Sequence, residues 1–175
     1  HFDEAHSLHV TKLALQIFDQ LRDEHGLDDH SRLLLESAAI LHDIGNFIST
    51  VRHHKHSQYI IENSEMFGFS RMDLRIISQI VRYHRKALPN SAQMKCALMS
   101  REERMQVLKL ASILRLADGL DRGHSQRVRS VRVEKGEEEI LLQVEYSGNL
   151  QVERSGLRLK AELFEEVFGY SVRLG

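Results

Sequence analysis

An apolar segment of this sequence ends in two ionisable residues, His42 and Asp43, and this feature constrains the fold most strongly. The segment 33–41 reads Leu-Leu-Leu-Glu-Ser-Ala-Ala-Ile-Leu, and its spacing predicts a helix with a buried apolar face. His42 follows Ala38 and Ala39 by four and three residues, so it lies on that same face. Burying two ionisable groups is costly unless a partner pairs with them. The helix must therefore end beside a neutralising group, for which a metal cation is the natural candidate.

Three more side chains of metal-ligating types fall on the apolar faces of other predicted helices. His6 precedes Val10 by four residues, and Asp118 follows Leu114 by four. His84 stands three residues after an apolar position of its own helix. One buried histidine alone is more often a core residue, but carboxylates are almost never buried unless they are paired or bound to metal. The sequence therefore predicts a metal site with the ligands His6, His42, Asp43 and Asp118.

A second group of histidines lies in the polar stretch 52–56, which reads Arg-His-His-Lys-His. Histidines clustered in a polar stretch are often surface residues. Two interpretations stay open for His56, a metal ligand or a surface residue, whereas His53 and His54 are candidates for proton transfer. If His56 and His84 also bind metal, the site has enough ligands for two ions.

Histidine and carboxylate ligands suit a divalent ion such as Mn, Fe, Co, Ni or Zn, and also Mg where carboxylates and water dominate. Such an ion lowers the pKa of bound water and neutralises phosphoryl oxygens, which points to hydrolysis of a phosphate compound. Whether one ion binds or two stays open. The candidate catalytic residues are His42, Asp43, His53 and His54.

Basic residues flank the candidate ligands along the chain. They are Arg82, Arg85, Lys86, Arg115 and Arg122. Each alone fits a surface residue whose apolar stem packs along the protein. As a group beside one metal site they favour a phosphate-bearing ligand, because a guanidinium group binds phosphate oxygens in pairs. We therefore expect these side chains to bind a phosphate-containing small molecule or polyphosphate.

Helical periodicity dominates residues 1–125. Gly26 marks the end of the first predicted helix, and Pro89 stops the fourth, after which the chain reads as a loop up to residue 99. Ser100 and Glu103 form the pattern of a capping box at the start of the last helix. The expected helices cover 3–25, 30–43, 54–62, 70–86 and 100–117.

The pattern changes after residue 125. In two segments apolar and polar side chains alternate, which is the period of a β-strand, and Gly136 marks the turn between them. Strands are expected at 126–134, 139–146, 150–154 and 170–174, and a helix at 157–168. The predicted fold class is therefore mainly α, a helical bundle (1–125) followed by a small C-terminal α/β subdomain (126–175).

Composition argues against several classes of protein. The 24 basic and 25 acidic residues leave a net charge of −1, which gives no general case for a nucleic-acid or membrane partner. The one cysteine, Cys96, cannot form an internal disulfide, which suits a reducing cytoplasm. We see no apolar run of the ~20 residues that cross a bilayer and no signal-peptide pattern. We therefore expect a cytoplasmic protein, and the absence of an initial methionine leaves room for a preceding domain.

The order His6…His42-Asp43…Asp118 resembles the ligand signature of the HD-domain metal-dependent phosphohydrolase superfamily. The matching strings are His-Ser-Leu-His-Val at 6–10, Leu-His-Asp-Ile-Gly at 41–45 and Leu-Ala-Asp-Gly-Leu-Asp-Arg at 116–122. This resemblance covers roughly residues 1–122 and implies an HD-type helical bundle that binds a divalent metal. His56 and His84 resemble the extra histidines of members that carry two ions.

The sequence is more closely similar to the C-terminal half of the exopolyphosphatase/guanosine pentaphosphate phosphatase family. The matching strings lie at 54–64, 80–87 and 113–118, and the α/β tail resembles the small appendage of that family. In that family a pair of N-terminal actin-like domains carries polyphosphate hydrolysis. Nothing in this chain resembles them, since it has no Gly-rich phosphate loop, so the resemblance implies actin-like domains as missing partners.

Two functions fit these observations. The first is a metal-dependent phosphohydrolase domain that acts on a phosphate ester, a nucleotide or polyphosphate. The second is a non-catalytic module of a larger exopolyphosphatase-like protein, which binds polyphosphate or a nucleotide or forms a homodimer. The retained ligand set favours the enzyme. The module is favoured because the α/β tail resembles the appendage of a family whose catalytic actin-like domains have no counterpart in this chain.

Overall fold

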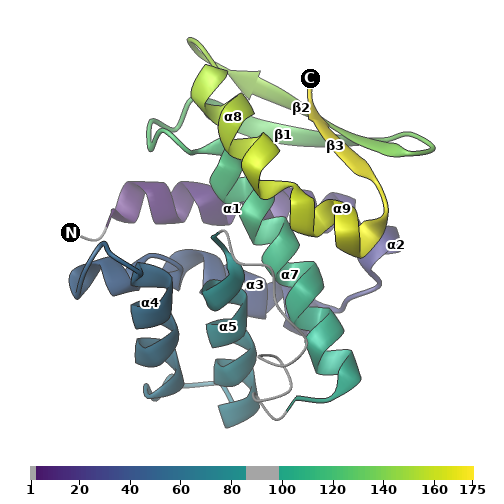
Figure 1. Cartoon of the computed structure of the whole chain (residues 1–175). Helices are drawn as coiled ribbons and strands as arrows, with labels where there is room; N and C mark the ends of the chain where they lie inside the picture. The colour runs from purple at the N-terminus through teal and green to yellow at the C-terminus, as the bar shows by residue number, and fades with distance from the viewer. Residues whose placement is uncertain (1–2, 86–98) are drawn as a thin grey trace.

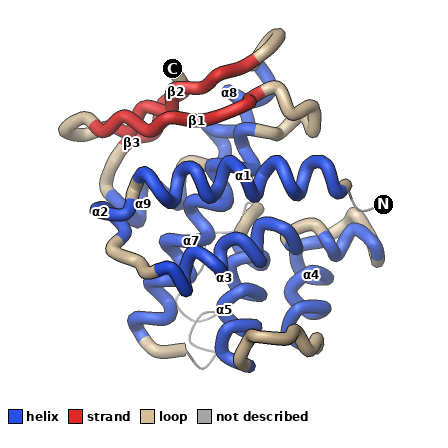
Figure 2. Tube along the Cα trace, turned by 180° about the vertical axis from the view of Figure 1, so that it is seen from behind, coloured by secondary structure: helices blue, strands red, loops and turns tan. Residues whose placement is uncertain are grey.

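The computed structural model of this protein describes residues 3–85 and 99–175 (Figures 1 and 2). It is mainly helical with a three-stranded sheet at one end, which confirms the predicted fold class. The helical elements of the first part are α1 (Glu4–Gln20), α2 (Arg22–His25), α3 (Asp29–Leu41), η1 (Ile44–Phe47), α4 (His53–Glu62), α5 (Arg71–Tyr83) and α7 (Arg101–Leu120). Within the described ranges no helix is long and apolar enough to cross a membrane.

The first predicted helix is divided in two by the structure. At Leu21 the backbone leaves helical values, with φ −107° and ψ 20°, and the chain restarts as α2. Gly26 ends α2 with a φ of 63°, the left-handed conformation that glycine adopts without steric cost. The predicted stop at Gly26 is therefore confirmed, and the interruption at Leu21 was not expected.

Serine caps begin two of the helices that build the centre of the molecule. The predicted capping box of Ser100 and Glu103 is confirmed at the start of α7. Ser70 and Asp73 form the same reciprocal pair of hydrogen bonds before α5. Each box satisfies backbone N–H groups that would otherwise lack partners at a helix start. Pro89 and the loop predicted around it lie outside the described residues.

The second part of the chain forms β1 (Val128–Lys135), β2 (Glu139–Tyr146), α8 (Gln151–Lys160), α9 (Glu162–Phe168) and β3 (Ser171–Leu174). The central strand β2 pairs antiparallel with β1 and parallel with β3. Three of the four predicted strands are confirmed. The strand predicted at 150–154 is wrong, because these residues lead into and begin α8. Leu150, Leu157 and Phe164 are buried at seven-residue intervals, which is helical spacing rather than the period of a strand.

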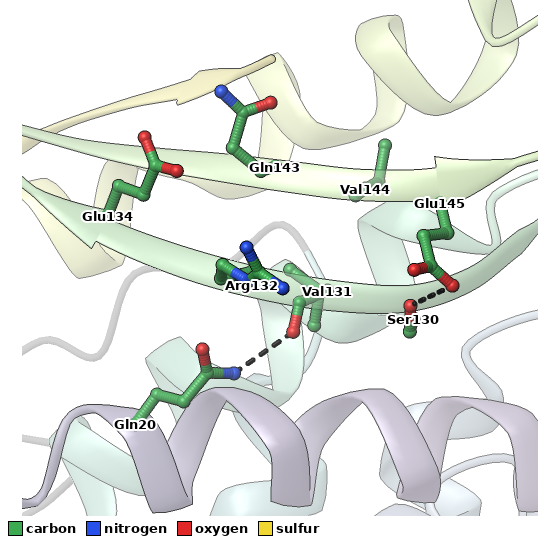
Figure 3. A pocket seen from close by; sticks show the side chains of 8 residues that line it. All are labelled: Gln20, Ser130, Val131, Arg132, Glu134, Gln143, Val144 and Glu145. Atoms are coloured by element: carbon green, nitrogen blue, oxygen red, sulfur yellow. Dashed lines mark hydrogen bonds between the residues drawn. The ribbon is translucent and has the colours of Figure 1, made fainter.

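Helix α1 covers the outer edge of β1 with side chains instead of a further strand (Figures 2 and 3). Gln16 Oε1 accepts a hydrogen bond from the Val131 backbone at 3.0 Å, and Gln20 Nε2 donates to the Val131 carbonyl at 3.0 Å. A polar groove of about 430 Å³ opens between Gln20 and the two strands beside it. Covering the edge in this way protects backbone groups that would otherwise pair with another chain.

Helix α7 is the centre of the packing and contacts α1, α3, α5, α8 and α9. All ten of its residues from 111 to 120 are buried. The hydrophobic core is continuous from the helices of the first part to β1, β2, α8 and α9. The predicted division into 1–125 and 126–175 therefore stays a prediction, since both parts contribute to one core.

Two glycines allow α8 to lie directly against α7 (Figure 1). A Cβ atom on Gly156 would lie 2.7 Å from the Gly119 carbonyl oxygen, and one on Gly119 would lie 3.1 Å from the Leu157 Cα. Real Cβ atoms essentially never approach as close as the first of these distances. This close crossing brings the last residue of α8, Lys160, to the end of α7.

Candidate metal centre

The ends of several helices meet at one buried cluster of histidines and carboxylates. Helix α1 contributes its first turn, and α4 contributes its first residue. The C-terminal ends of α3, α5 and α7 and the last residue of α8 complete the cluster. Side-chain nitrogen and oxygen atoms form two sets of contacts, one around Asp118 and one around Asp43. The two sets adjoin because Lys160 also reaches the His84 carbonyl and His42 lies within ligand distance of members of both. Its members are His6, His42, Asp43, His53, His84, Asp118, Asp121 and Lys160.

His42 has one ring nitrogen paired and the other free. It follows the last residue of α3, and its Nδ1 donates to the Ala39 carbonyl at 2.7 Å, three residues back. The Nε2 atom is buried and lacks a hydrogen-bond partner among the residues the structure describes. Complete burial lowers the pKa of His42 to about 4, so the ring is neutral near pH 7 and Nε2 carries a lone pair. This is the state in which an imidazole binds a metal ion.

His84 repeats the same arrangement at the end of α5. Its Nδ1 donates to the Val81 carbonyl at 2.6 Å, which leaves Nε2 as the acceptor atom. Burial lowers the pKa of His84, and the nearby His42 ring and Lys160 lower it further. Its Nε2 lies 3.7 Å from Asp43 Oδ1 and 3.3 Å from His53 Nε2. Both helices thus end with a neutral imidazole whose Nε2 faces the cluster.

His6 is oriented by a carboxylate rather than by a carbonyl. Its Nδ1 lies 2.8 Å from Asp121 Oδ2, and its Nε2 lies 3.6 Å from Asp118 Oδ1. Burial acts to raise the pKa of Asp121, but hydrogen bonds from His6 and Gln126 outweigh it and lower that pKa. Asp121 therefore stays a carboxylate, and it fixes the His6 ring with Nε2 directed at the cluster.

The carboxylate of Asp43 is the meeting point of three imidazole rings. Its Oδ1 lies 3.1 Å from His53 Nε2 and 3.8 Å from His42 Nε2, in addition to the contact with His84. Burial acts to raise the pKa of Asp43, but the hydrogen bond from His53, together with the imidazole rings around the carboxylate, lowers it below its ordinary value. Asp43 therefore remains ionised although only 7% of it is exposed.

Among residues 3–85 and 99–175, three groups of side chains have ligand atoms within 4.8 Å of one another. Two ligand atoms on one ion bound at about 2.1 Å lie at most about 4.2 Å apart, so small side-chain movements would suffice for coordination. The free, buried Nε2 of His42 belongs to two of the groups, which is the observation that best fits a metal ion here. The groups are His6–His42–Asp118, His42–Asp43–His84 and His6–Asp43–His124.

The structure brings most of the predicted ligands together and places two predicted histidines beside them. His53 contacts Asp43 directly, as described above. His54 lies next to His53, with ring centroids 5.9 Å apart, and belongs to none of the three ligand groups. Burial and the charge of Arg82 lower the pKa of His54 to about 4. His56 is half-buried on α4 and is likewise outside the ligand groups that the described residues form.

The predicted phosphate-binding residues occupy different environments. Arg85 and Arg122 line a small cavity of about 20 Å³ together with Lys160. Arg115 is fully buried under α8, where its Nε donates to the Lys160 carbonyl at 3.2 Å, and burial lowers its pKa. Arg82 is half-buried, with its guanidinium 6.0 Å from the Tyr83 ring centroid. Lys86 lies outside the described residues.

Sequence reasoning missed the contribution of Lys160. Its ammonium group contacts the Asp118 carboxylate and donates to the His84 carbonyl at 3.1 Å. Burial, together with the charges of Arg115 and Arg85, lowers the pKa of Lys160 to about 7, while Asp43 opposes this change. The available signal was its position three residues after Leu157 on the buried face of α8.

His124 and Asp121 were also not among the predicted site residues. His124 is exposed, but its ring stacks on His6 with centroids 3.7 Å apart. Its Nδ1 lies 3.0 Å from Asp3 Oδ2, and its φ of 50° is left-handed. Strained residues of this kind are common at functional sites. Neither its backbone conformation nor the direction of Asp121 could be read from residue spacing.

The fold and the cluster together define a helical domain with a candidate divalent-metal centre. Residues 1–164 match the model of a protein family described as Ppx/GppA phosphatase, domain III. Because this match covers most of the chain, the chain belongs to the Ppx/GppA phosphatase family. The predicted resemblance to the exopolyphosphatase/guanosine pentaphosphate phosphatase family is thereby confirmed.

Curated relatives of the chain are named guanosine-5'-triphosphate,3'-diphosphate pyrophosphatase. The protein of Pseudoalteromonas translucida is 34% identical over 89 residues, which cover 50% of this chain and 18% of the relative. That of Pseudoalteromonas atlantica is 31% identical over 121 residues, 65% of this chain and 24% of the relative. That of Photobacterium profundum is 26% identical over 113 residues, which cover 64% of this chain and 23% of the relative. The chain therefore spans about a quarter or less of the length of these relatives.

Proposed function

We propose that this chain is a metal-dependent phosphohydrolase domain of a longer Ppx/GppA-type protein, acting on a phosphate ester, a nucleotide or polyphosphate. The observation that carries the proposal is the buried Nε2 of His42, which has no hydrogen-bond partner among residues 3–85 and 99–175. His42 belongs to one ligand group with His6 and Asp118 and to another with Asp43 and His84. Leaving such an atom without a partner is costly, and a divalent ion removes that cost.

The four predicted ligands and two neighbouring histidines have proposed roles. His6, His42, Asp43 and Asp118 would hold the ion, which would supply water activation and charge neutralisation at a phosphoryl group. His53, hydrogen-bonded to Asp43 at 3.1 Å, is the candidate for carrying a proton at the edge of the site. His54 stays a weaker candidate because its contacts are with His53 and Arg82.

The substrate side of the proposal rests on Arg85 and Arg122. Their cavity of about 20 Å³ has room for about one water molecule, so a phosphate group would bind these arginines at its opening. The cavity adjoins Lys160, which contacts Asp118, so that phosphate group would lie near the carboxylate cluster. Guanidinium groups suit this role because they present paired donors to phosphate oxygens. The names of the relatives single out guanosine 5'-triphosphate 3'-diphosphate as a compound to test, together with polyphosphate.

A second function is favoured by the size of the relatives. The aligned regions cover 18–24% of these proteins, which leaves ample chain for a catalytic site elsewhere, such as the predicted actin-like domains. In that case this domain binds a nucleotide or polyphosphate, or pairs two copies, without hydrolysing anything itself. The metal centre would then have a structural or ligand-binding role.

One experiment separates these functions. The untagged protein is analysed for divalent metal, then tested for phosphate release from guanosine 5'-triphosphate 3'-diphosphate, polyphosphate and a simple aryl phosphate. Asp43→Asn is compared with the wild type, and Asp23→Asn, an exposed substitution on α2, is the matched control. We expect bound metal and turnover that Asp43→Asn abolishes and the control retains.

The two other outcomes decide against the proposal. A protein that binds metal and substrate but releases no phosphate supports the non-catalytic module. A wild type that binds no divalent metal and releases no phosphate contradicts the metal-dependent function altogether.

A further inference from the structure

We propose that Lys160 is a built-in cation that takes the place of a second metal ion, so that the centre holds a single divalent ion. This inference deepens the proposed function and rests on it, because it concerns how the same site is filled. The ligand groups alone leave the number of ions open, since His42 is shared between two of them.

The contacts of Lys160 place its charge between those two groups. Its ammonium contacts the carboxylate of Asp118, a member of the group with His6. The same ammonium donates to the carbonyl of His84, a member of the group with Asp43. A positive charge in this position can serve both groups.

The position of Lys160 is built into the fold and is not that of a surface lysine. Only 5% of the residue is exposed. The crossing of α8 over α7 at Gly119 and Gly156 fixes the helix that carries it. Arg115, itself fully buried, donates from Nε to the Lys160 carbonyl at 3.2 Å and so holds the backbone at this residue.

The charges of the centre balance with one divalent ion. Three buried carboxylates, Asp43, Asp118 and Asp121, carry three negative charges. One divalent ion and the ammonium of Lys160, whose charged form the Asp118 carboxylate in contact with it favours, supply three positive charges. A second divalent ion would leave an uncompensated excess of positive charge in a buried site, which is strongly unfavourable.

The test counts metal ions in variants of one residue. Purified wild type and the variants Lys160→Met, Lys160→Gln and Lys160→Arg are loaded with Mn²⁺, desalted, and analysed for Mn per chain. Arg158→Gln, an exposed substitution on the same helix, is the matched control. Met and Gln remove the charge while keeping length, whereas Arg keeps the charge. We expect one ion in the wild type, Lys160→Arg and the control, and two ions in Lys160→Met and Lys160→Gln.

A second measurement uses the wild type alone and does not depend on the folding of any variant. Electron paramagnetic resonance of the Mn²⁺-loaded protein distinguishes an isolated ion from a magnetically coupled pair. We expect the spectrum of an isolated ion. A coupled pair in the wild type would overturn the inference and leave the metal-dependent function standing.

The remaining outcomes also separate the two proposals. Folded Lys160→Met and Lys160→Gln proteins that still bind only one ion overturn the role of Lys160 and leave the metal centre intact. No ion in the wild type or in any variant contradicts the proposed function, and this inference fails with it.

Discussion

Two buried histidines at helix ends, His25 and His42, show how a core histidine differs from a candidate ligand. His25 closes α2, and both of its ring nitrogens are paired: Nε2 donates to the Phe18 carbonyl at 2.9 Å, and Nδ1 accepts from the Leu27 backbone at 2.9 Å. His42 closes α3 with Nδ1 paired, and its Nε2 has no partner in the part of the chain that the structure describes. Burial alone therefore does not distinguish a core histidine from a candidate metal ligand. The number of ring nitrogens that have a hydrogen-bond partner does.

The surroundings of the two rings support the same distinction. His25 packs against the Phe18 ring, with centroids 4.1 Å apart. His42 lies near two other imidazoles, with its centroid 5.3 Å from that of His6 and 5.1 Å from that of His84. Neutral imidazoles gathered beside carboxylates form a donor set for a metal, whereas a lone paired imidazole does not.

The largest expected effect comes from substituting the free imidazole. His42→Gln should weaken Mn²⁺ binding by more than about 100-fold, because it removes a shared ligand and loss of a supporting residue alone costs about 10–100-fold. His25→Gln should leave the affinity unchanged. Isothermal titration of both variants with Mn²⁺ checks this. Equal Mn²⁺ affinities would show that His42 is no more a metal ligand than His25 is.

A smaller loss is expected from the residue that orients His6. Asp121→Asn retains the shape of the side chain but removes the charge that fixes the His6 ring through a 2.8 Å contact. Mn²⁺ affinity should fall by about 10–100-fold with the number of bound ions unchanged. Unaltered affinity in a correctly folded Asp121→Asn protein would show that the ring needs no such support.

Substitution of the core histidine, His25, should lower the stability of the protein rather than its affinity for Mn²⁺. His25→Ala removes two buried hydrogen bonds and a packed ring, so the free energy of unfolding should fall by about 2–4 kcal/mol. Urea denaturation of the metal-free protein measures this, with His30→Ala, an exposed histidine, as the control. A decrease as small as that of the control would mean that His25 is not part of the structural core.

The smallest expected effect is a pH dependence that belongs to His25. Burial lowers the pKa of His25 from the ordinary 6.5, so its neutral form contributes stability that is fully present above pH 6.5. That contribution is lost as the pH falls below 6.5, because the unfolded chain takes up a proton that the folded ring resists. The free energy of unfolding should therefore fall less steeply with acid in His25→Gln than in the wild type. Identical pH profiles for the two proteins would contradict this.

The comparison also shows what residue spacing can and cannot predict. Periodicity placed His42 and Asp118 on buried helix faces, and the capping box at Ser100 located the start of α7. Both predictions depend on neighbours a few residues away. They needed no knowledge of how the helices pack.

Features that depend on tertiary packing were missed. The strand predicted at 150–154 was wrong because a short apolar segment fits either period until the buried positions are known. Lys160 reaches Asp118 only because two glycines let α8 approach α7, and His124 reaches His6 through a left-handed backbone at a non-glycine residue. Such contacts join residues far apart in the chain and leave no periodic signal.

The most direct test of the metal centre is the location of the ion. Crystals of the protein soaked with Mn²⁺ should show one anomalous scattering peak per chain, bounded by the Nε2 atoms of His6 and His42 and the carboxylates of Asp43 and Asp118. His25 should show none. The account would be contradicted if saturating Mn²⁺ gave no peak at this centre, or if the ion were bound elsewhere on the chain.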